Sequence, residues 1–246
     1  GVRAGDVVLN CFGYHLTPAG MIFESGARAV GAAVLPAGTG QTELQVRAAV
    51  DVGTSVYSGT PDYLKVILDK AEEMGERLAI TRAAVGGGAL FPSLRQEYAD
   101  RGIACLQCYA TADLGNIAYE SPAMEGMILD EGVIVEIVRP GTGDPVPEGE
   151  VGEVVVTTLN PDYPLVRFAT GDLSALMPGV SPCGRTNARI RGWLGRADQT
   201  TKIKGMFVRP EQVAAFVAAH PEVKRARVIA SRDGEMDVMT VRIETD

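Results

Sequence analysis

Residues 6–107 alternate between short apolar runs and segments with the spacing of amphipathic helices, and glycine or proline separates most of them. The apolar runs predict strands at 6–10, 32–36, 54–58, 78–85 and 103–107. The intervening segments predict helices at 18–30, 43–50, 61–74 and 92–99. Strands that alternate with helices indicate an α/β fold, a parallel sheet with helices on its faces.

Two of the predicted helices carry recognisable start signals. Pro61 is well placed for the first position of a helix, where its missing N–H costs nothing. Thr42 precedes Glu43 and is expected to cap the helix that follows with its side chain.

The pattern changes near Gly115. Short alternating runs between residues 127 and 156, separated by a turn rich in Gly, Pro and Asp, predict antiparallel hairpins. Past residue 198 the pattern indicates a strand, a helix at 211–219, and two strands joined by an Asp-Gly turn at 233–234. We therefore predict three domains: an α/β domain at 1–114, a β subdomain at 115–194, and a small and incomplete α+β domain at 195–246.

Composition restricts the class of protein. Nucleic-acid-binding proteins are usually basic, whereas the formal net charge of this chain is −8, so no nucleic-acid partner is expected. No apolar run approaches the roughly 18 residues of a membrane span, and no signal peptide is visible. The four cysteines at irregular spacing are typical of a reducing, cytoplasmic setting. The chain starts without Met and in mid-pattern, so it reads as a piece of a longer protein.

Cys105 and Cys108 have the spacing of a redox or metal motif. No second Cys/His pair accompanies them, however, and they lie in an apolar run. We favour two thiols packed within a strand, since free cysteine behaves as a small hydrophobe.

The stretch from Tyr163 to Arg209 contains the strongest candidate site. An apolar run ends in a predicted turn at 170–172, and Asp172 in that turn can accept two hydrogen bonds from a vicinal diol such as a ribose. Arg196, Lys202 and Lys204 follow and can neutralise a phosphate. The alternative is a surface turn followed by a solvated basic hairpin.

Three further segments follow predicted strands. Gly86–Gly88 either allows a ligand to approach the backbone or forms a tight turn before a helix. Tyr109–Asp113 is expected at the carboxyl edge of the sheet, where Tyr109 can stack on a base and Asp113 can hold Mg²⁺. Tyr14 and His15 can line a pocket, although a lone His is more often structural.

In this order, these segments resemble the adenylate-forming enzymes, in particular the phenylacetate–CoA ligase-like branch. The resemblance covers essentially all 246 residues. It is carried by Arg167, Asp172, Gly195, Arg196, Asp198, Lys204, Gly205 and Pro210.

The resemblance implies a role for each candidate residue. Asp172 would hold the ribose, Arg196 the ribose or a phosphate, and Asp113 a Mg²⁺ ion. Asp198 would be the hinge of the small domain, and Tyr14 and His15 would line the acid pocket. The rest of the nucleotide site would comprise Gly86, Gly87, Gly88, Tyr109, Ala110, Thr111 and Lys204.

The implied activity is that of an AMP-forming acid–thiol ligase. ATP would activate a carboxylic acid, aryl or arylacetic, to an acyl-adenylate, and CoA would then accept the acyl group. The family's phosphate loop should lie before residue 1 and its catalytic Lys beyond residue 246. The oligomeric state is not readable from the sequence, and a homodimer stays open.

Four departures from the family pattern leave alternatives open. Gly88 stands where the branch usually has Glu, Ala110 replaces Gly, Ala112 replaces a hydroxyl residue, and Asp113 replaces a Glu. A catalytically impaired nucleotide-binding or interaction module is therefore one alternative. An enzyme that passes the acyl group to a carrier protein is another.

Overall fold

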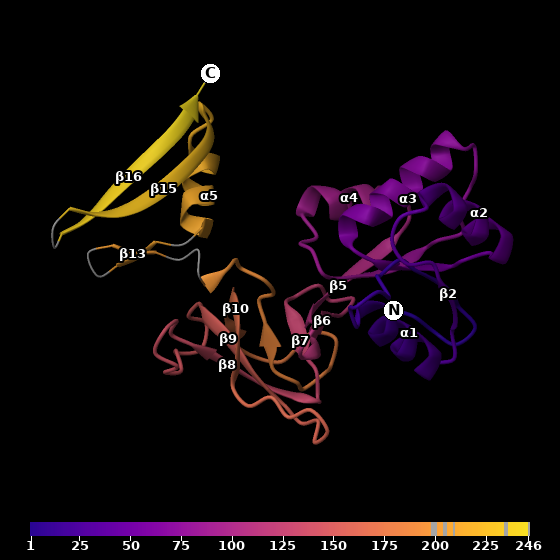
Figure 1. Cartoon of the computed structure of the whole chain (residues 1–246), viewed down its shortest axis with the longest axis horizontal. Helices are drawn as coiled ribbons and strands as arrows, with labels where there is room; N and C mark the ends of the chain where they lie inside the picture. Colours follow the sequence, from indigo (N-terminus) through magenta and orange to yellow (C-terminus); the bar gives the residue numbers. More distant parts are fainter. Residues whose placement is uncertain (198–200, 204–205, 209, 234–235, 246) are drawn as a thin grey trace. The chain divides into compact units, whose positions relative to one another are not determined.

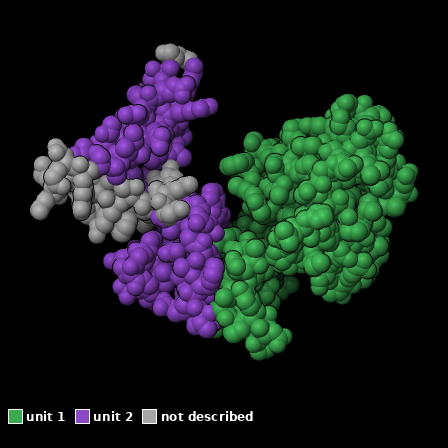
Figure 2. All heavy atoms as spheres, viewed as in Figure 1, with its two compact units in different colours: residues 1–134, 158–165, 177–192 green, residues 135–157, 166–176, 193–246 purple. Residues whose placement is uncertain are grey.

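The computed structural model describes residues 1–197, 201–203, 206–208, 210–233 and 236–245. By contacts the chain separates into two compact units (Figure 2). Unit 1 comprises Gly1–Ile134, Thr158–Leu165 and Met177–Gly192. Unit 2 comprises Val135–Thr157, Val166–Leu176 and Trp193–Asp246.

A largely parallel sheet and its helices make up the first half of the chain (Figure 1). Its parallel strands lie in the order β5-β4-β3-β1-β2. They are β1 (Val7–Asn10), β2 (Ala33–Pro36), β3 (Val56–Gly59), β4 (Arg82–Val85) and β5 (Ala104–Thr111). The helices are α1 (Ala19–Ala29), α2 (Thr42–Val52), α3 (Pro61–Glu73) and α4 (Pro92–Asp100).

Both faces of this sheet are covered. Val8 and Val56 pack with Ala27 of α1 on one face. On the other face, Leu9 and Tyr57 join the main core with side chains of α2, α3 and α4. Because successive side chains of a strand point to opposite faces, a strand whose four residues are all buried, such as β3, is covered on both sides.

Two local predictions need correction. Thr42 does not cap α2: the N-cap residue is Gln41, in the left-handed region at φ 57°, and the Thr42 hydroxyl lies 3.1 Å from the Tyr63 hydroxyl instead. The fourth strand begins at Arg82, later than predicted, and β5 continues to Thr111. The extension of β5 has a physical reason, since its last residues pair with the strand that follows.

That next strand, β6 (Gly115–Glu120), pairs antiparallel with β5. The same sheet continues through β7 (Met127–Leu129), β12 (Arg189–Ile190) and β11 (Leu176–Met177). The predicted domain boundary between residues 114 and 115 thus lies at the start of β6, within a paired hairpin.

The remaining strands form separate antiparallel sheets, as the alternating pattern predicted. Three strands lie in the order β10-β9-β8: β8 (Val133–Val138), β9 (Gly152–Thr158) and β10 (Phe168–Ser174). The C-terminal elements are β13 (Thr201–Ile203), β14 (Met206–Val208), α5 (Pro210–Ala219), β15 (Val223–Asp233) and β16 (Met236–Thr245). The predicted fold class, α/β with a parallel sheet and additional antiparallel strands, is confirmed.

Candidate functional site

Asp172 lies on a bulge in the middle of β10. The pairing of β10 with β9 is regular at Phe168 and Ala169 and resumes at Leu173, so residues 170–172 bend out of the ladder. Gly171 has φ 73°, and the Thr170 hydroxyl accepts a hydrogen bond from the Asp172 backbone N–H. The sequence predicted that the strand ends at this point. A bulge places the carboxylate differently, because the strand continues on both sides of it.

The carboxylate of Asp172 is held by Arg196. Nη1 of Arg196 donates to Asp172 Oδ1 and to the carbonyl of Thr170, both at 3.1 Å. The Asp172 side chain is 13% exposed and that of Arg196 is 40% exposed. The segment before Arg196 runs antiparallel beside β10, with a backbone hydrogen bond from Leu173 to Gly195. The two motif residues predicted from the sequence are therefore in direct contact.

A second donor to this carboxylate was not predicted. Nε1 of Trp193 lies 3.0 Å from Asp172 Oδ1. Trp193 is the single tryptophan of the sequence and stands two residues before the Gly195–Arg196 motif. The position of the single tryptophan beside a recognisable motif is the one sequence feature that could have indicated Trp193.

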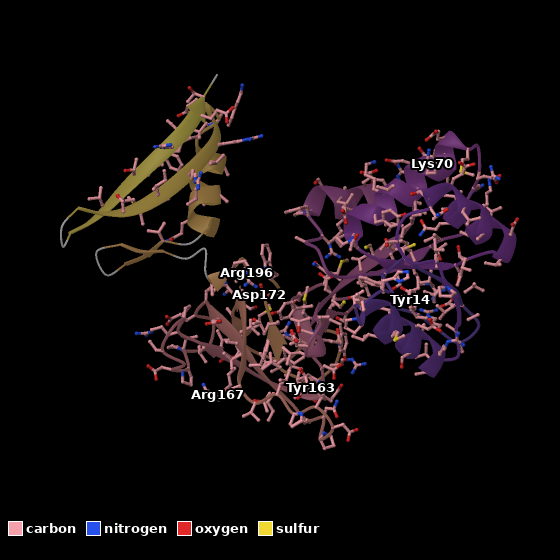
Figure 3. All side chains as sticks on the ribbon, in the orientation of Figure 1. Tyr14, Lys70, Tyr163, Arg167, Asp172 and Arg196 are labelled. Atoms are coloured by element: carbon pink, nitrogen blue, oxygen red, sulfur yellow. The ribbon has the colours of Figure 1, made fainter. Side chains whose placement is uncertain are left out.

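Arg167 lies away from the Asp172–Arg196 pair (Figure 3). Its Nε donates to Glu136 at 3.0 Å, and its Nη2 donates to the carbonyl of Gly143 at 2.8 Å. These contacts attach Arg167 to β8 and to the turn that follows it. Although it matches the motif, its side chain therefore has a structural role in this sheet.

Gly86–Gly88 directly follows β4 in unit 1. A β-carbon at Gly86 would lie 2.7 Å from Sγ of Cys108, and one at Gly87 would lie 3.8 Å from the ring of Phe12. Gly87 and Gly88 are exposed, whereas Gly86 is buried. The glycine turn thus lies at the carboxyl end of β4, beside Cys108 of β5, and only a side chain as small as hydrogen fits at Gly86.

The segment Tyr109–Asp113 does not simply follow a strand. Tyr109 and Thr111 belong to β5, and Asp113 lies in the exposed turn between β5 and β6. The Thr111 hydroxyl accepts a hydrogen bond from the Leu114 backbone N–H at 3.1 Å, so it stabilises this turn. The carboxylate of Asp113 therefore lies at the tip of a hairpin whose base adjoins the glycine turn.

Tyr14 is bound to α1. Its hydroxyl accepts a hydrogen bond from Asn10 and donates one to Glu24, each at 2.8 Å, and its ring packs against Gly20. Burial, together with the hydrogen bond to Glu24, raises the pKa of Tyr14 to about 12. His15 follows in the exposed loop.

The two groups of candidate residues belong to different units. Unit 1 contains Tyr14, His15, Gly86–Gly88 and the segment 109–113, and unit 2 contains Asp172 and Arg196. Asp198 and Lys204 lie outside the described residues. Within the described ranges, no three His, Cys, Asp or Glu side chains are grouped so that they could hold a metal ion. Cys105 and Cys108 both lie in β5, as expected.

No family model matches the chain. A phenylacetate–coenzyme A ligase of Thermus thermophilus is 32% identical over 254 residues, which cover 99% of this chain and 57% of the relative. The enzyme of the same name from Pseudomonas putida is 32% identical over 257 residues, with the same coverage. The chain belongs to the phenylacetate–CoA ligase-like branch of the adenylate-forming enzymes.

A solved structure of this superfamily has the same fold. The open conformation of 2-hydroxyisobutyryl-CoA ligase, in complex with 2-HIB-AMP and CoA, matches with a TM-score of 0.87 at 22% identity. The match covers 100% of this chain and 56% of that one. The chain thus spans slightly more than half the length of the ligases it matches. Across the described residues, no helix has both the length and the apolar character needed to cross a bilayer.

Proposed function

We propose that the protein to which this chain belongs is an AMP-forming ligase that joins a carboxylic acid to coenzyme A. The carboxylate oxygen of the acid attacks the α-phosphorus of ATP, the bond to the bridging oxygen breaks, and pyrophosphate leaves. The thiolate of CoA then attacks the carbonyl carbon of the acyl-adenylate, and AMP leaves. The phenylacetate–CoA ligases in the comparison support an aryl or arylacetic acid as the substrate.

The observation that carries this proposal is the fixed carboxylate of Asp172. Arg196 and Trp193 both donate to its Oδ1. A carboxylate accepts hydrogen bonds at both of its oxygens, which is what the vicinal hydroxyls of a ribose require. Arg196 carries the positive charge that a ribose–phosphate ligand needs beside that carboxylate.

The adenine site is assigned to the meeting point of the parallel strands in unit 1. Exposed Gly87 and Gly88 let a flat ligand approach the backbone, and Tyr109 offers an aromatic face. Ala110 and Thr111 continue the same strand, and Lys204 is expected to complete the nucleotide site.

The Mg²⁺ ion of the reaction is assigned to Asp113. An exposed single carboxylate fits this ion, because Mg²⁺ is often held by one or two carboxylates together with phosphate oxygens and water. When bound, the ion neutralises charge on the phosphates. Asp113 would hold it through one oxygen.

Tyr14 and His15 are assigned to the acid pocket, and Asp198 to the hinge between the two half-reactions. The hydrogen bonds of Tyr14 to Asn10 and Glu24 hold its ring against α1, so that ring forms a rigid wall rather than a mobile gate. A cytoplasmic setting stays a prediction from the cysteines, and a homodimer stays open.

The experiment is a steady-state assay of the intact protein with ATP, Mg²⁺, phenylacetate and CoA, with pyrophosphate release and thioester formation followed separately. Asp172→Ala is expected to abolish pyrophosphate release, because the ribose loses its acceptor. Asp198→Pro is expected to spare pyrophosphate release and to block thioester formation. Pyrophosphate release by the Asp172→Ala variant at the wild-type rate would refute the ribose assignment.

The same assay separates this proposal from its alternatives. A nucleotide-binding module would bind AMP without releasing pyrophosphate from ATP. An enzyme that serves a carrier protein would release pyrophosphate but leave CoA unacylated.

A further inference from the structure

The contact between Trp193 and Asp172 has no explanation in core packing. Trp193 is 47% exposed, so about half of its large apolar surface faces water. Its indole N–H nevertheless lies 3.0 Å from Oδ1 of a carboxylate that is only 13% exposed. A leucine or phenylalanine would cover the same neighbouring surface, but neither offers a hydrogen-bond donor at this place.

The backbone holds Trp193 in position. The N–H of Leu194 donates to the carbonyl of Leu173 at 2.9 Å, and the N–H of Leu173 donates to the carbonyl of Gly195 at 2.8 Å. Both bonds join Leu173, the neighbour of Asp172, to the two residues that follow Trp193. The indole therefore approaches the carboxylate from a segment whose register with β10 is set independently of it.

The carboxylate needs such support because of where it lies. The bulge removes residues 170–172 from the regular ladder. In addition, the terminal torsion angle of an aspartate side chain has a broad, roughly two-fold distribution, so this angle alone does not fix the carboxylate. Arg196 and Trp193 donate to the same oxygen, Oδ1, from two different side chains. Two donors at one oxygen fix the plane of the carboxylate, and so the direction in which it accepts further hydrogen bonds.

We propose that Trp193 is a positioning residue for nucleotide binding: its indole N–H orients the Asp172 carboxylate toward the vicinal hydroxyls of a ribose. This inference rests on the proposed function, because it takes Asp172 as the ribose acceptor. Trp193 contacts the carboxylate that is proposed to bind the ribose, and it does not contact the reacting atoms. Its effect should therefore appear in nucleotide affinity, whereas the affinity for the acid should not change.

The test compares the wild-type chain with Trp193→Phe, which keeps an aromatic ring and removes the donor. AMP affinity is measured by calorimetry. We expect Trp193→Phe to bind AMP about tenfold more weakly, as for the loss of one hydrogen bond to a charged group. In the intact protein the KM for ATP should rise by a similar factor, while kcat and the KM for the acid change less than about twofold. AMP affinity of Trp193→Phe within twofold of the wild type would overturn the proposal.

A second measurement does not depend on the folding of that variant. Because Trp193 is the single tryptophan of the 246 residues, tryptophan-labelled protein gives one indole N–H resonance. We expect that resonance downfield of the position for a solvated indole, and we expect it to move when AMP is added. Asp172→Asn should shift it upfield, because the charged acceptor is lost. An indole resonance that neither AMP nor Asp172→Asn displaces would refute the contact.

The outcomes also separate this inference from the proposed function. If the wild type binds neither AMP nor ATP, the proposed function fails. If the wild type binds AMP and Trp193→Phe binds it equally well, only the positioning role of Trp193 fails.

Discussion

A β-carbon at Gly171 would lie 2.5 Å from Nη2 of Arg196, closer than such atoms approach one another in proteins. Gly171 also has φ 73°, a backbone conformation that residues with a side chain rarely adopt. The glycine therefore serves two purposes: it allows the bulge in β10, and it leaves room for the guanidinium that reaches Asp172.

We predict that Gly171→Ala displaces Arg196 and weakens AMP binding by about tenfold or more, since a charge-assisted hydrogen bond is lost. Gly179→Ala is the matched control. Gly179 has the same φ of 73°, but a β-carbon there would meet nothing within 4 Å. Both variants should lose about 1–2 kcal/mol of stability from the left-handed backbone, and only Gly171→Ala should lose affinity. Equal AMP affinities, measured by calorimetry, would contradict the steric role of Gly171.

Cys183 is predicted to be the reactive thiol of the chain. Hydrogen bonds from the Ser181 hydroxyl, at 3.1 Å, and from the Arg185 backbone lower the pKa of Cys183 to about 7. Burial raises the pKa of Cys11 and Cys105 to about 12 and that of Cys108 to about 11. With this lowered pKa, Cys183 carries more thiolate at pH 7 than an ordinary thiol, of which about 3% is ionised.

Iodoacetamide at pH 7 should therefore alkylate Cys183 first, which peptide mass spectrometry would detect. The rate should rise with pH and level off above about pH 7–8, because the thiolate is then fully formed. Ser181→Ala removes the hydrogen-bond donor, so the pKa of Cys183 rises and alkylation at pH 7 slows several-fold. If iodoacetamide alkylated the Cys183→Ser variant as fast as the wild type, another thiol would be the reactive one.

Asp6 is predicted to make stability depend on acid pH. Burial alone raises the pKa of Asp6, but hydrogen bonds from the Arg3 backbone, the Arg82 guanidinium and the Ser55 hydroxyl outweigh it and lower the pKa. A carboxylate with a lowered pKa in the folded state stabilises the protein above its unfolded-state pKa of about 3.9. This contribution is lost as the pH falls through the folded-state value.

Asp6→Asn should therefore reduce the free energy of unfolding by about 2–3 kcal/mol at pH 7, and the difference from the wild type should shrink toward pH 3. Urea denaturation at both pH values measures this. Asp51→Asn, at an exposed position of α2, is the control and should change stability by less than about 0.5 kcal/mol at either pH. A loss for Asp6→Asn that is as large at pH 3 as at pH 7 would argue against ionisation as its cause.

Two ion pairs of equal length are predicted to differ in their importance. Arg95–Glu120 and Arg47–Glu43 each have an N–O distance of 2.6 Å. The side chain of Glu120 is 12% exposed, and it also accepts the backbone N–H of Gln107. Glu43 and Arg47 are both more than 60% exposed.

We expect Glu120→Ala to cost about 2–4 kcal/mol, because it leaves the half-buried Arg95 and a backbone donor without their acceptor. Glu43→Ala should cost less than about 0.5 kcal/mol, as is usual for an exposed helix pair. Urea denaturation of the two variants gives the comparison. A similar loss for both would mean that burial does not decide the strength of these pairs.

Much of the candidate site was visible in the sequence because its signals are local. The apolar runs and glycine turns predicted the parallel strands, and in the structure Gly86 follows β4 and lies beside Cys108 of β5. The family resemblance assigned Asp172 and Arg196 to a common site, and the structure places them in direct contact. The end of β10 was predicted wrongly because a strand that bulges and continues has the same local pattern, Thr-Gly-Asp, as a strand that ends.

By itself the sequence determined the α/β class, the order of most elements and the identity of the charged residues in the site, since periodicity, turn residues and charge act over a few neighbouring positions. Only the tertiary structure decided which partners these charges have. Trp193 meets Asp172 across 21 residues, and Arg167 turns to Glu136 across 31 residues. Such contacts depend on the register of paired strands and on a bulge, and neither can be recognised from the hydrophobic periodicity of the sequence.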